Sequence, residues 1–279
     1  MTARAGVSVR DALDGARTAI AAAGSSSARL DAELLLAGAL GVARSRLIVE
    51  PEMTLEGEAV RTFQSHVRRR SVDREPVAYI LGRRAFRRLT LSVDPRVLIP
   101  RPETELLVEV VSELPGIERV LDCATGSGAV ALALKDERSD LDVTGSDISP
   151  PALAVAQANA QRLALEVSWR CADLLDGLDD TYDVIVANPP YVPSAALAKL
   201  VPEIVRHEPL LALDGGSDGL AVIRRLVSQT AATKSPALVL EHGMGQGDAV
   251  AELCHRAGFT TIERRRDLAG IERVLLAQR

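Results

Sequence analysis

Apolar residues recur at helical spacing through residues 8–82, with polar residues between them. Serine and proline residues mark where these segments begin, and glycines mark where they end. Because each predicted helix is short, we expect the helices to pack as a small bundle. The pattern predicts a helix over residues 8–23 capped by Ser8, a second that follows Ser25–Ser27 and ends near Gly41, a third capped by Thr54, and a helical turn from Pro76 to Gly82.

From residue 119 onward, short apolar runs alternate with helical patterns. Such alternation is typical of a parallel sheet with crossover helices, and it predicts a ligand site outside the carboxyl ends of the central strands. Alternation over residues 86–93 predicts a β-hairpin between the bundle and the sheet. The predicted strands are residues 120–123, 143–146, 167–169, 184–187 and 238–240, with an antiparallel pair at the sheet edge from residues 259–263 and 273–277.

The chain of 279 residues is 47% hydrophobic and 25% charged, which is ordinary for a soluble globular protein and long enough for two domains. No apolar run approaches the roughly 18 to 20 residues that span a bilayer, so we expect a cytoplasmic protein without a membrane segment. Three unevenly spaced cysteines, with no Cys-x-x-Cys pair, favour buried reduced thiols. The four histidines show no metal-ligand spacing, and we expect no metal.

Charge is distributed unevenly along the chain. The net charge is −5, but residues 1–90 carry 15 Arg against 10 Asp or Glu and so hold +5, which leaves −10 for the remainder. An arginine-bearing first domain suits an acidic or ribonucleoprotein partner, although Arg68, Arg69 and Arg70 equally suit a solvated helix face. Aromatic residues make up only 3% of the chain, which disfavours the stacking platforms that bind single-stranded nucleic acid.

A glycine-rich turn follows the first predicted strand. It contains Ala124, Thr125, Gly126, Ser127 and Gly128, and a helical segment begins directly after it. Glycines let a ligand approach the backbone closely, and the following helix supplies free N–H groups, as in nucleotide-binding folds. A tight strand-to-helix turn without a ligand is the alternative, because Gly-x-Gly matches only part of the dinucleotide pattern and no phosphate-binding lysine is present.

Acidic residues follow the next two predicted strands. Asp147 stands 19 residues past Gly128, a spacing at which a carboxylate can accept both hydroxyls of a ribose, although it also suits a charge at the helix that begins near Ser149. Asp173 is placed to accept from an adenine amino group, and the backbone N–H of Leu174 to bond a ring nitrogen. A short glycine loop among acidic residues suits a nucleoside with a positive sulfonium. S-adenosylmethionine, with S-adenosylhomocysteine as product, is therefore the leading cofactor.

The predicted strand at residues 184–187 runs directly into Asn188, Pro189, Pro190 and Tyr191. The prolines lack N–H groups and keep the segment extended, so it is stiff and rich in free acceptors. A planar –NH₂ group can donate there to the Asn188 side-chain oxygen and the Pro189 carbonyl, with Tyr191 against its flat face. Asn-Pro and Pro-Pro are also common in turns. After the cofactor loop, however, the quartet favours methylation of an amide or amino nitrogen, with Asn188, Pro189 and Tyr191 as the catalytic candidates.

This order of motifs resembles class I S-adenosylmethionine-dependent methyltransferases that act on amino groups. Further similarity covers nearly all of the chain and is to the HemK family, the peptide chain release factor glutamine methyltransferases. It rests on residues 75–82 (EPVAYILG), Phe86, residues 97–105 (VLIPRPETE), Glu208 and Pro209, Gly215 and Gly216, residues 218–220, residues 241–243 (EHG) and Gln246.

The resemblance implies an α/β fold: a class I methyltransferase Rossmann-like sheet, mostly parallel with an antiparallel edge strand, after a small helical bundle and a β-hairpin linker. The implied divisions are a substrate-docking domain at residues 1–83, the hairpin and linker at 84–105 and the catalytic domain at 106–279. The implied reaction is methyl transfer to the side-chain N5 of the glutamine in the Gly-Gly-Gln motif of class 1 release factors, which supports translation termination. By family position, residues 124–128, Asp147, Leu174 and Asn188 line the cofactor site, and Asn188, Pro189, Pro190 and Tyr191 line the site of the substrate glutamine.

Two alternatives stay open. An adenine-N6 methyltransferase acting on nucleic acid shares the quartet at residues 188–191, and a non-catalytic module would only hold a translation factor. The sequence also departs from the family at Ala124, with Cys123 before it, where Gly and an apolar residue are more usual. Because alanine adopts many of the φ values that suit glycine, we expect slightly altered cofactor affinity and intact activity.

Overall fold

The computed structural model describes residues 7–178 and 181–279; residues 1–6, at the start of the predicted first domain, and residues 179–180 lie outside the described part. The chain divides into two compact units. The first comprises Met1–Gly82 together with Val201–His207, and the second comprises Arg83–Leu200 together with Glu208–Arg279. A short segment from the middle of the second half of the sequence therefore belongs to the first unit.

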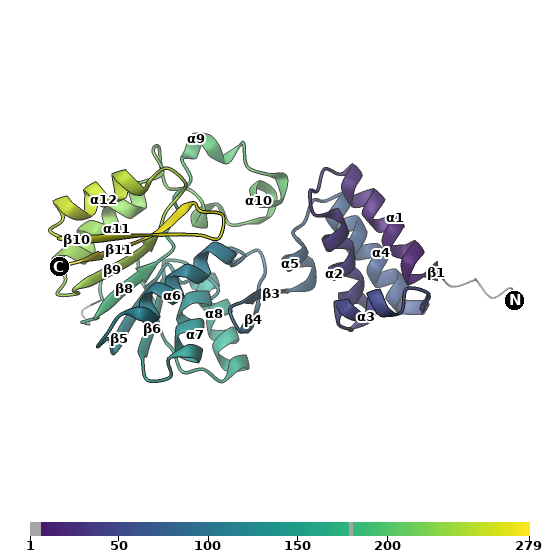
Figure 1. Cartoon of the computed structure of the whole chain (residues 1–279), viewed down its shortest axis with the longest axis horizontal. Helices are drawn as coiled ribbons and strands as arrows, with labels where there is room; N and C mark the ends of the chain where they lie inside the picture. The colour runs from purple at the N-terminus through teal and green to yellow at the C-terminus, as the bar shows by residue number, and fades with distance from the viewer. Residues whose placement is uncertain (1–6, 179–180) are drawn as a thin grey trace, which may run out of the picture. The chain divides into compact units, whose positions relative to one another are not determined.

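The first unit is helical, and α1, α2 and α4 lie side by side in it (Figure 1). Its core is formed by apolar side chains of these helices, including the fully buried Val9, Ile20 and Leu35. The elements are β1 (Val7–Ser8), α1 (Val9–Ala22), α2 (Ala28–Leu40), α3 (Arg44–Val49), β2 (Thr54–Leu55), α4 (Gly57–Ser71), α5 (Val77–Leu81) and α10 (Pro202–His207).

The predicted helix caps are right at two ends and wrong at one. Ser8 caps α1 through a hydrogen bond from the Asp11 N–H, and α2 ends at Gly41, whose φ of 65° closes the helix in the left-handed region. Thr54 does not cap a helix. It lies in β2, where its backbone pairs with Ser8 in an antiparallel bridge, and this pairing holds it extended while α4 begins only at Gly57.

A cluster of charged side chains joins three helices of the first unit. Arg70 of α4 is only 7% exposed, and its guanidinium donates to Asp31 of α2 at 2.7 Å and to Glu203 of α10 at 2.6 Å. Arg74 donates to the same Glu203 carboxylate at 3.0 Å. Two arginines and two carboxylates thus neutralise one another, and they attach the Val201–His207 segment to this unit.

The second unit contains a seven-stranded sheet with the order β10-β11-β9-β8-β5-β6-β7. The strands from β9 to β7 in this order are mutually parallel, while β11 pairs antiparallel with both β9 and β10. The predicted fold class, a mostly parallel Rossmann-like sheet with an antiparallel edge, is confirmed. The strands are β5 (Arg119–Cys123), β6 (Asp142–Asp147), β7 (Ser168–Cys171), β8 (Val184–Ala187), β9 (Ala237–Glu241), β10 (Thr261–Arg266) and β11 (Glu272–Gln278).

Helices cover both faces of this sheet, so the second unit has three layers (Figure 1). One face packs against α6 (Glu105–Glu113), α7 (Ala129–Glu137) and α8 (Pro150–Leu163), and the other against α11 (Ala221–Ala232) and α12 (Gly247–Arg256). Because both faces are covered, β8 and β9 are buried at every residue, which is why they read as continuous apolar runs in the sequence. The remaining elements are the hairpin β3 (Arg83–Phe86) and β4 (Leu89–Ser92), η1 (Pro102–Thr104), α9 (Ser194–Leu197) and η2 (Leu210–Ala212).

The strand order places a topological switch point at β5. The chain leaves β5 to form β6 and β7 on one side, and it continues later with β8 and β9 on the other. Ligands of such sheets bind in the crevice outside the carboxyl ends of the strands at this point.

In residues 7–178 and 181–279, no group of three or more His, Cys, Asp or Glu side chains is placed to hold a metal ion. Over the same residues, none of the helices has the length and apolar character needed to cross a membrane.

Candidate active site

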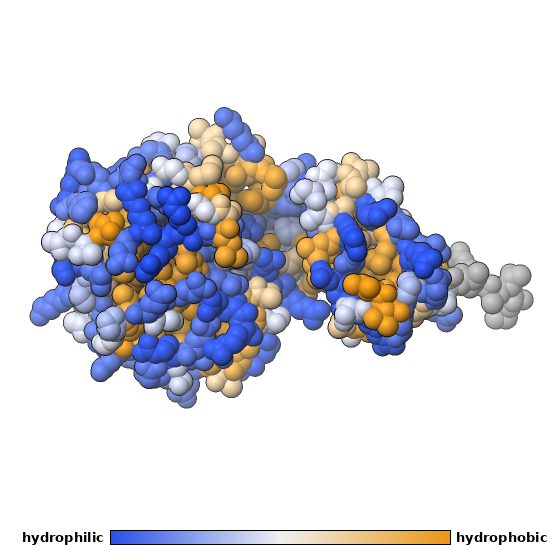
Figure 2. Space-filling view, viewed as in Figure 1, coloured by the Kyte–Doolittle hydropathy of each residue, from blue (hydrophilic) through white to orange (hydrophobic). Residues whose placement is uncertain are grey.

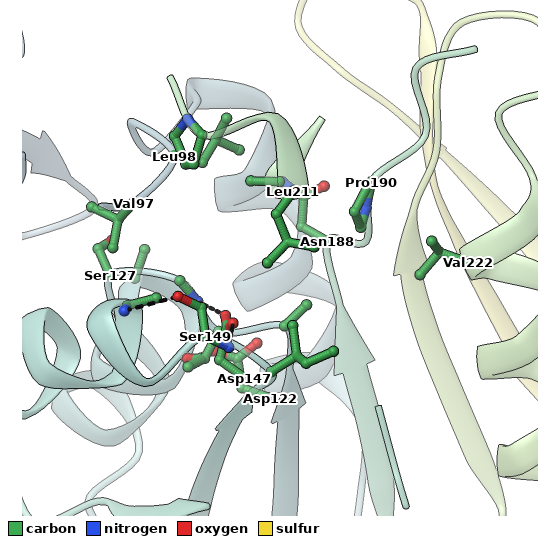
Figure 3. Close-up of a pocket in the computed structure, with 18 of the residues that line it drawn as sticks. Val97, Leu98, Asp122, Ser127, Asp147, Ser149, Asn188, Pro190, Leu211 and Val222 are labelled. Carbon is green, nitrogen blue, oxygen red and sulfur yellow. Dashed lines mark hydrogen bonds between the residues drawn. The ribbon is translucent and has the colours of Figure 1, made fainter. Parts of the chain in front are cut away.

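A cavity opens at the carboxyl ends of β5, β6 and β8 (Figure 3). Most of the residues that the sequence predicts for the cofactor and the substrate line it together, although they come from four separate stretches of chain. They are Ala124, Thr125, Gly126, Ser127, Asp147, Asp173, Leu174, Asn188 and Pro190. Gly128, Pro189 and Tyr191, also predicted, do not contribute to its lining.

The glycine-rich turn leaves β5 and enters α7 through residues with positive φ. Gly126 has φ 56° and Gly128 has φ 81° at the N-cap of α7, so both positions require what glycine permits. Ala124 also lies in the left-handed region, with φ 59°. This φ is not one that alanine shares freely with glycine, because an alanine Cβ in this region crowds the following carbonyl and costs about 1 to 2 kcal/mol. The turn is therefore strained at Ala124. The expected effect on cofactor affinity and activity stays a prediction.

A buried carboxylate that the sequence did not single out supports this turn. Asp122, the penultimate residue of β5, is 2% exposed and accepts from the Thr125 hydroxyl at 2.5 Å and from the Ala131 N–H at 3.0 Å. Burial raises its pKa to about 7, against the lowering effect of these two hydrogen bonds and with a further raising effect from nearby Asp147. Asp122 thus ties the start of the turn to the first residues of α7.

Asp147 takes the place at the start of α8 that its sequence position allowed, and its contact with a ribose stays a prediction. Its carboxylate accepts from the backbone N–H of Gly126 and of Ser149, each at 2.9 Å, while the Ser149 hydroxyl accepts from Ala152 and caps α8. Each carboxylate oxygen has a second lone pair, so the group can still accept the hydroxyls of a ribose in the cavity. Burial raises its pKa, and the backbone hydrogen bonds act in the opposite direction.

Asp173 and Leu174 lie beside the cavity after β7. Arg225 of α11 donates to the Asp173 carboxylate at 2.8 Å, in a half-exposed ion pair that the sequence did not predict. Leu174 has φ 58°, a left-handed conformation that is unusual for a leucine.

Asn188 is held by a chain of hydrogen bonds that ends at a buried carboxylate. Its Nδ2 donates to the Thr104 Oγ1 at 3.0 Å, and the Thr104 hydroxyl donates to Glu241 Oε2 at 2.7 Å. The Tyr191 hydroxyl donates to the other oxygen of Glu241, at 3.1 Å. Thr104 and Glu241 lie in motifs that carry the family resemblance, but their residue types alone gave no reason to assign them a role.

The loop that contains Tyr191 is held in place by the Gln246 side chain and by close contacts with two glycines. The Gln246 side chain donates to the Tyr191 carbonyl at 3.0 Å and accepts from the Gly243 N–H at 2.7 Å. A Cβ on Gly215 would come within 2.8 Å of Tyr191 Cα, and one on Gly219 within 2.4 Å of Tyr191 O. These positions therefore admit only glycine, because the loop backbone lies directly against them.

Comparisons with known proteins agree with this geometry. The PrmC N-terminal domain family matches residues 11–82, and the Methyltransferase small domain family matches residues 102–247. A release factor glutamine methyltransferase of Pseudomonas aeruginosa is 46% identical, with 91% of this chain and 94% of the relative covered. One of Moorella thermoacetica is 42% identical, with 98% of this chain and 99% of the relative covered. The chain belongs to the release factor glutamine methyltransferase family.

The fold of the family is shared more widely. The catalytic domain of hMettl16, solved in complex with a MAT2A 3′UTR hairpin, superposes with a TM-score of 0.57 at 16% sequence identity, covering 79% of this chain and 81% of that domain. At this identity the similarity concerns the fold alone.

As a member of the release factor glutamine methyltransferase family, the protein is an enzyme that transfers methyl groups, and S-adenosylmethionine is its methyl donor. The residues present fit this cofactor. The cavity combines a turn with positive φ at Gly126, which allows close approach to the backbone, with the inward-facing carboxylate of Asp147 (Figure 3). Among the described residues that line it there is no lysine of the kind that binds phosphates in P-loops, although Arg96, Arg101 and Arg225 do line it.

Burial is the largest cause of the pKa shifts of Glu241 and Tyr191, the two titratable groups near Asn188 described above. Glu241 is 1% exposed, and burial raises its pKa to about 7 although the hydroxyls of Thr104 and Tyr191 donate to it. Nearby Glu103 raises this pKa further and Arg273 lowers it. Burial and the Glu241 charge together raise the pKa of the Tyr191 hydroxyl, which therefore stays protonated and acts as a donor.

Proposed function

We propose that this protein methylates the side-chain N5 of the glutamine in the Gly-Gly-Gln motif of class 1 peptide chain release factors, and so supports translation termination. The relatives that cover nearly all of the chain are release factor glutamine methyltransferases, which supports a release factor as the substrate. The observation that carries the proposal is the orientation of Asn188 at the cavity. Its Nδ2 is engaged by Thr104, so its Oδ1 is available to accept from an incoming –NH₂ group.

The assigned roles follow from the chemistry of an amide. An amide nitrogen is a poor nucleophile because its lone pair is delocalised into the carbonyl. The bound cofactor supplies a methyl group on a positively charged sulfur. Asn188 Oδ1 and the Pro189 carbonyl each accept one hydrogen of the substrate –NH₂, and Tyr191 lies against the glutamine side chain. These acceptors favour the more positive nitrogen that develops during attack, and its surplus proton leaves to water.

Positioning supplies most of the rate in this proposal. Holding two reactants in line contributes roughly 7 to 11 kcal/mol relative to free collision, whereas a general base contributes about 10²- to 10⁴-fold. No histidine, lysine or cysteine lines the cavity among the described residues, so its side chains offer acceptors and shape instead of a conventional base. Asp147 and the turn at residues 124–128 hold the methyl donor, with Asp173 and Leu174 at its adenine.

Residues 1–83 dock the protein substrate in this proposal, residues 84–105 link the two parts, and residues 106–279 carry the chemistry. The surface of the first unit supports docking by its arginines and by exposed apolar residues: Ile48 and Val49 at the end of α3 are 65% and 77% exposed. Figure 2 shows apolar patches of this kind among a mainly hydrophilic surface. We place the reaction in the cytoplasm, with no membrane and no sequence-specific nucleic acid as partner.

The test is mass spectrometry of a purified class 1 release factor, and of an adenine-containing oligonucleotide, after incubation with the protein and isotopically labelled S-adenosylmethionine. We expect a label on the glutamine of the Gly-Gly-Gln motif and none on adenine. A label only on adenine would overturn the substrate assignment, and the absence of any label despite cofactor binding would indicate a non-catalytic module that holds a translation factor.

A further inference from the structure

We propose that Thr104 and Glu241 are positioning residues that fix which way round the carboxamide of Asn188 stands, and that this orientation sets the rate of methyl transfer. The inference rests on the proposed function, because it assigns Asn188 Oδ1 to the substrate. Neither residue needs to touch the substrate –NH₂ in this arrangement. Thr104 also lines the cavity, and in this proposal its effect on the rate passes through Asn188.

The orientation of an asparagine amide is decided by its neighbours, since its oxygen and nitrogen have the same shape. The neighbour here is Thr104, whose hydroxyl has one hydrogen and two lone pairs. Glu241 Oε2, at 2.7 Å, takes that hydrogen, because an ionised carboxylate can only accept. Thr104 is left with lone pairs toward Asn188, and at 3.0 Å only the Nδ2 side of the amide can meet them.

The amide therefore presents Oδ1 on its other side, where Asn188 lines the cavity. A flipped amide would present two hydrogens to a substrate nitrogen that must itself donate, and the contact would become repulsive. Without the Thr104 hydroxyl, or without the charge on Glu241, both orientations become accessible. Only one of them is productive.

Glu241 is itself fixed at the end of β9. Its second oxygen accepts from the Tyr191 hydroxyl at 3.1 Å, so the carboxylate cannot rotate away from Thr104 without losing this partly buried hydrogen bond as well. η1, which ends at Thr104, and β9, which ends at Glu241, belong to the same unit. Thr104 and Glu241, which form this part of the hydrogen-bond chain, thus both lie at the ends of regular secondary-structure elements.

The first experiment reads the orientation without any substrate. The chain contains only two asparagines, Asn159 and Asn188, so selective ¹⁵N-asparagine labelling gives two side-chain NH₂ signals. We expect slow hydrogen exchange at Asn188 in the wild-type protein and at least about 10-fold faster exchange in Thr104→Val, in line with loss of one hydrogen bond. Asn159 donates to the Ser92 and Ser127 carbonyls and is the internal control. Equal exchange at Asn188 in both proteins overturns the inference.

The second experiment measures kcat with a release factor at saturating S-adenosylmethionine. Thr104→Val is expected to lower kcat by about 10-fold while the dissociation constant of the cofactor changes by less than about 3-fold, and Thr104→Ser, which keeps the hydroxyl, to restore most of the rate. In an Asn188→Ala background, Thr104→Val should cost less than about 2-fold, because its effect passes through Asn188. Full additivity of the two substitutions contradicts this route.

Thr230→Val is the matched control. Thr230 is fully buried on α11 and donates to the Leu226 carbonyl of its own helix, so this variant loses a core hydroxyl that is not part of the site. We expect wild-type kcat from it. Failure of the two proposals is distinguishable: a wild-type enzyme that labels no glutamine refutes the proposed function, whereas an active enzyme indifferent to Thr104→Val refutes the positioning role.

Discussion

Two glutamates, the partly buried Glu203 of the first unit and the buried Glu241 of the second, are held by opposite kinds of partner. Glu203 of the first unit is 14% exposed and receives hydrogen bonds from the guanidinium groups of Arg70 and Arg74. Burial raises its pKa, but the two arginines outweigh burial and lower it to about 2. Glu241 of the second unit receives hydrogen bonds from the hydroxyls of Thr104 and Tyr191, and burial raises its pKa to about 7.

We interpret this difference as one between a structural carboxylate and a carboxylate that is retained for function. A carboxylate neutralised by arginines holds segments together, as Glu203 holds Val201–His207 to the first unit. A carboxylate buried among neutral donors destabilises the fold when it is charged, so its presence needs another explanation. At Glu241 the explanation that we propose is the orientation of Asn188, and such perturbed groups are concentrated at functional sites in general.

Of the substitutions at these two sites, Glu203→Gln is expected to have the largest effect on the free energy of unfolding. The substitution leaves the buried Arg70 and the partly buried Arg74 with one carboxylate, and we expect the free energy of unfolding at pH 8 to fall by about 3 kcal/mol. Because the folded pKa of Glu203 is lowered, its contribution is present above its ordinary value of 4.5 and is lost as the pH falls through about 2. Denaturant unfolding at pH 8 and pH 3 checks both statements. An equal loss at the two pH values would contradict the pairing.

Asn188→Ala removes the group that Glu241 orients. We expect kcat to fall by about 10²-fold or more, comparable to loss of one preorganised contact to the reacting group, while cofactor affinity falls less. Single-turnover methylation and equilibrium cofactor binding measure the two quantities. Turnover near that of the wild type would refute the role of Asn188 and, with it, the functional reading of Glu241.

The sequence predicts the strands and the cofactor turn, but it does not predict the side-chain contacts on which these two substitutions act. The strands and the cofactor turn were predictable, because buried parallel strands are continuous apolar runs and a turn with positive φ carries glycine. Thr104 and Glu241 were not, because they lie 84 residues before and 53 residues after Asn188 and meet only in the fold. The attachment of Glu203 to α4, 133 residues from Arg70, was hidden for the same reason.

Ala124 shows a second limit of the sequence. The residue was visible as a departure from the family, but its φ of 59° was not, and the sign of its effect depends on φ. Pro189 and Tyr191 illustrate a third limit, since adjacency to Asn188 in sequence does not place a side chain in the cavity lining.

The pH dependence of kcat tests whether the charge on Glu241 affects the rate of methyl transfer. Protonation of Glu241 below about pH 7 removes the charge that orients Thr104, so at saturating cofactor we expect kcat to fall about 5-fold between pH 8 and pH 5.5 and then to level off. Burial and Glu103 raise this pKa, whereas the hydrogen bonds from Thr104 and Tyr191 and the charge of Arg273 lower it. Asp122 also has a pKa of about 7, but it supports the cofactor turn and should alter cofactor affinity instead. A kcat independent of pH over this range would remove Glu241 from the rate.

The smallest effect is expected from Ala124→Gly, which changes strain in the same cavity without changing charge. Glycine relieves the left-handed conformation but gains freedom in the unfolded chain, so we expect about 0.5 to 1 kcal/mol of added stability. Unlike the effects at the two glutamates, this gain should be the same at pH 5 and pH 8. A loss of stability in thermal unfolding would contradict the strain at Ala124.

Glu241→Gln, with kcat and the free energy of unfolding measured on the same preparation, is the most direct test of the difference between the two glutamates. Because the folded pKa of Glu241 is raised from 4.5 to about 7, the stability it provides is full below 4.5 and is lost as the pH rises through 7. At pH 8 we therefore predict a variant that is more stable than the wild type by about 1 to 2 kcal/mol and slower by about 5-fold. A variant that is less stable at pH 8, or one that keeps the wild-type kcat, would contradict a carboxylate retained for function at the expense of stability.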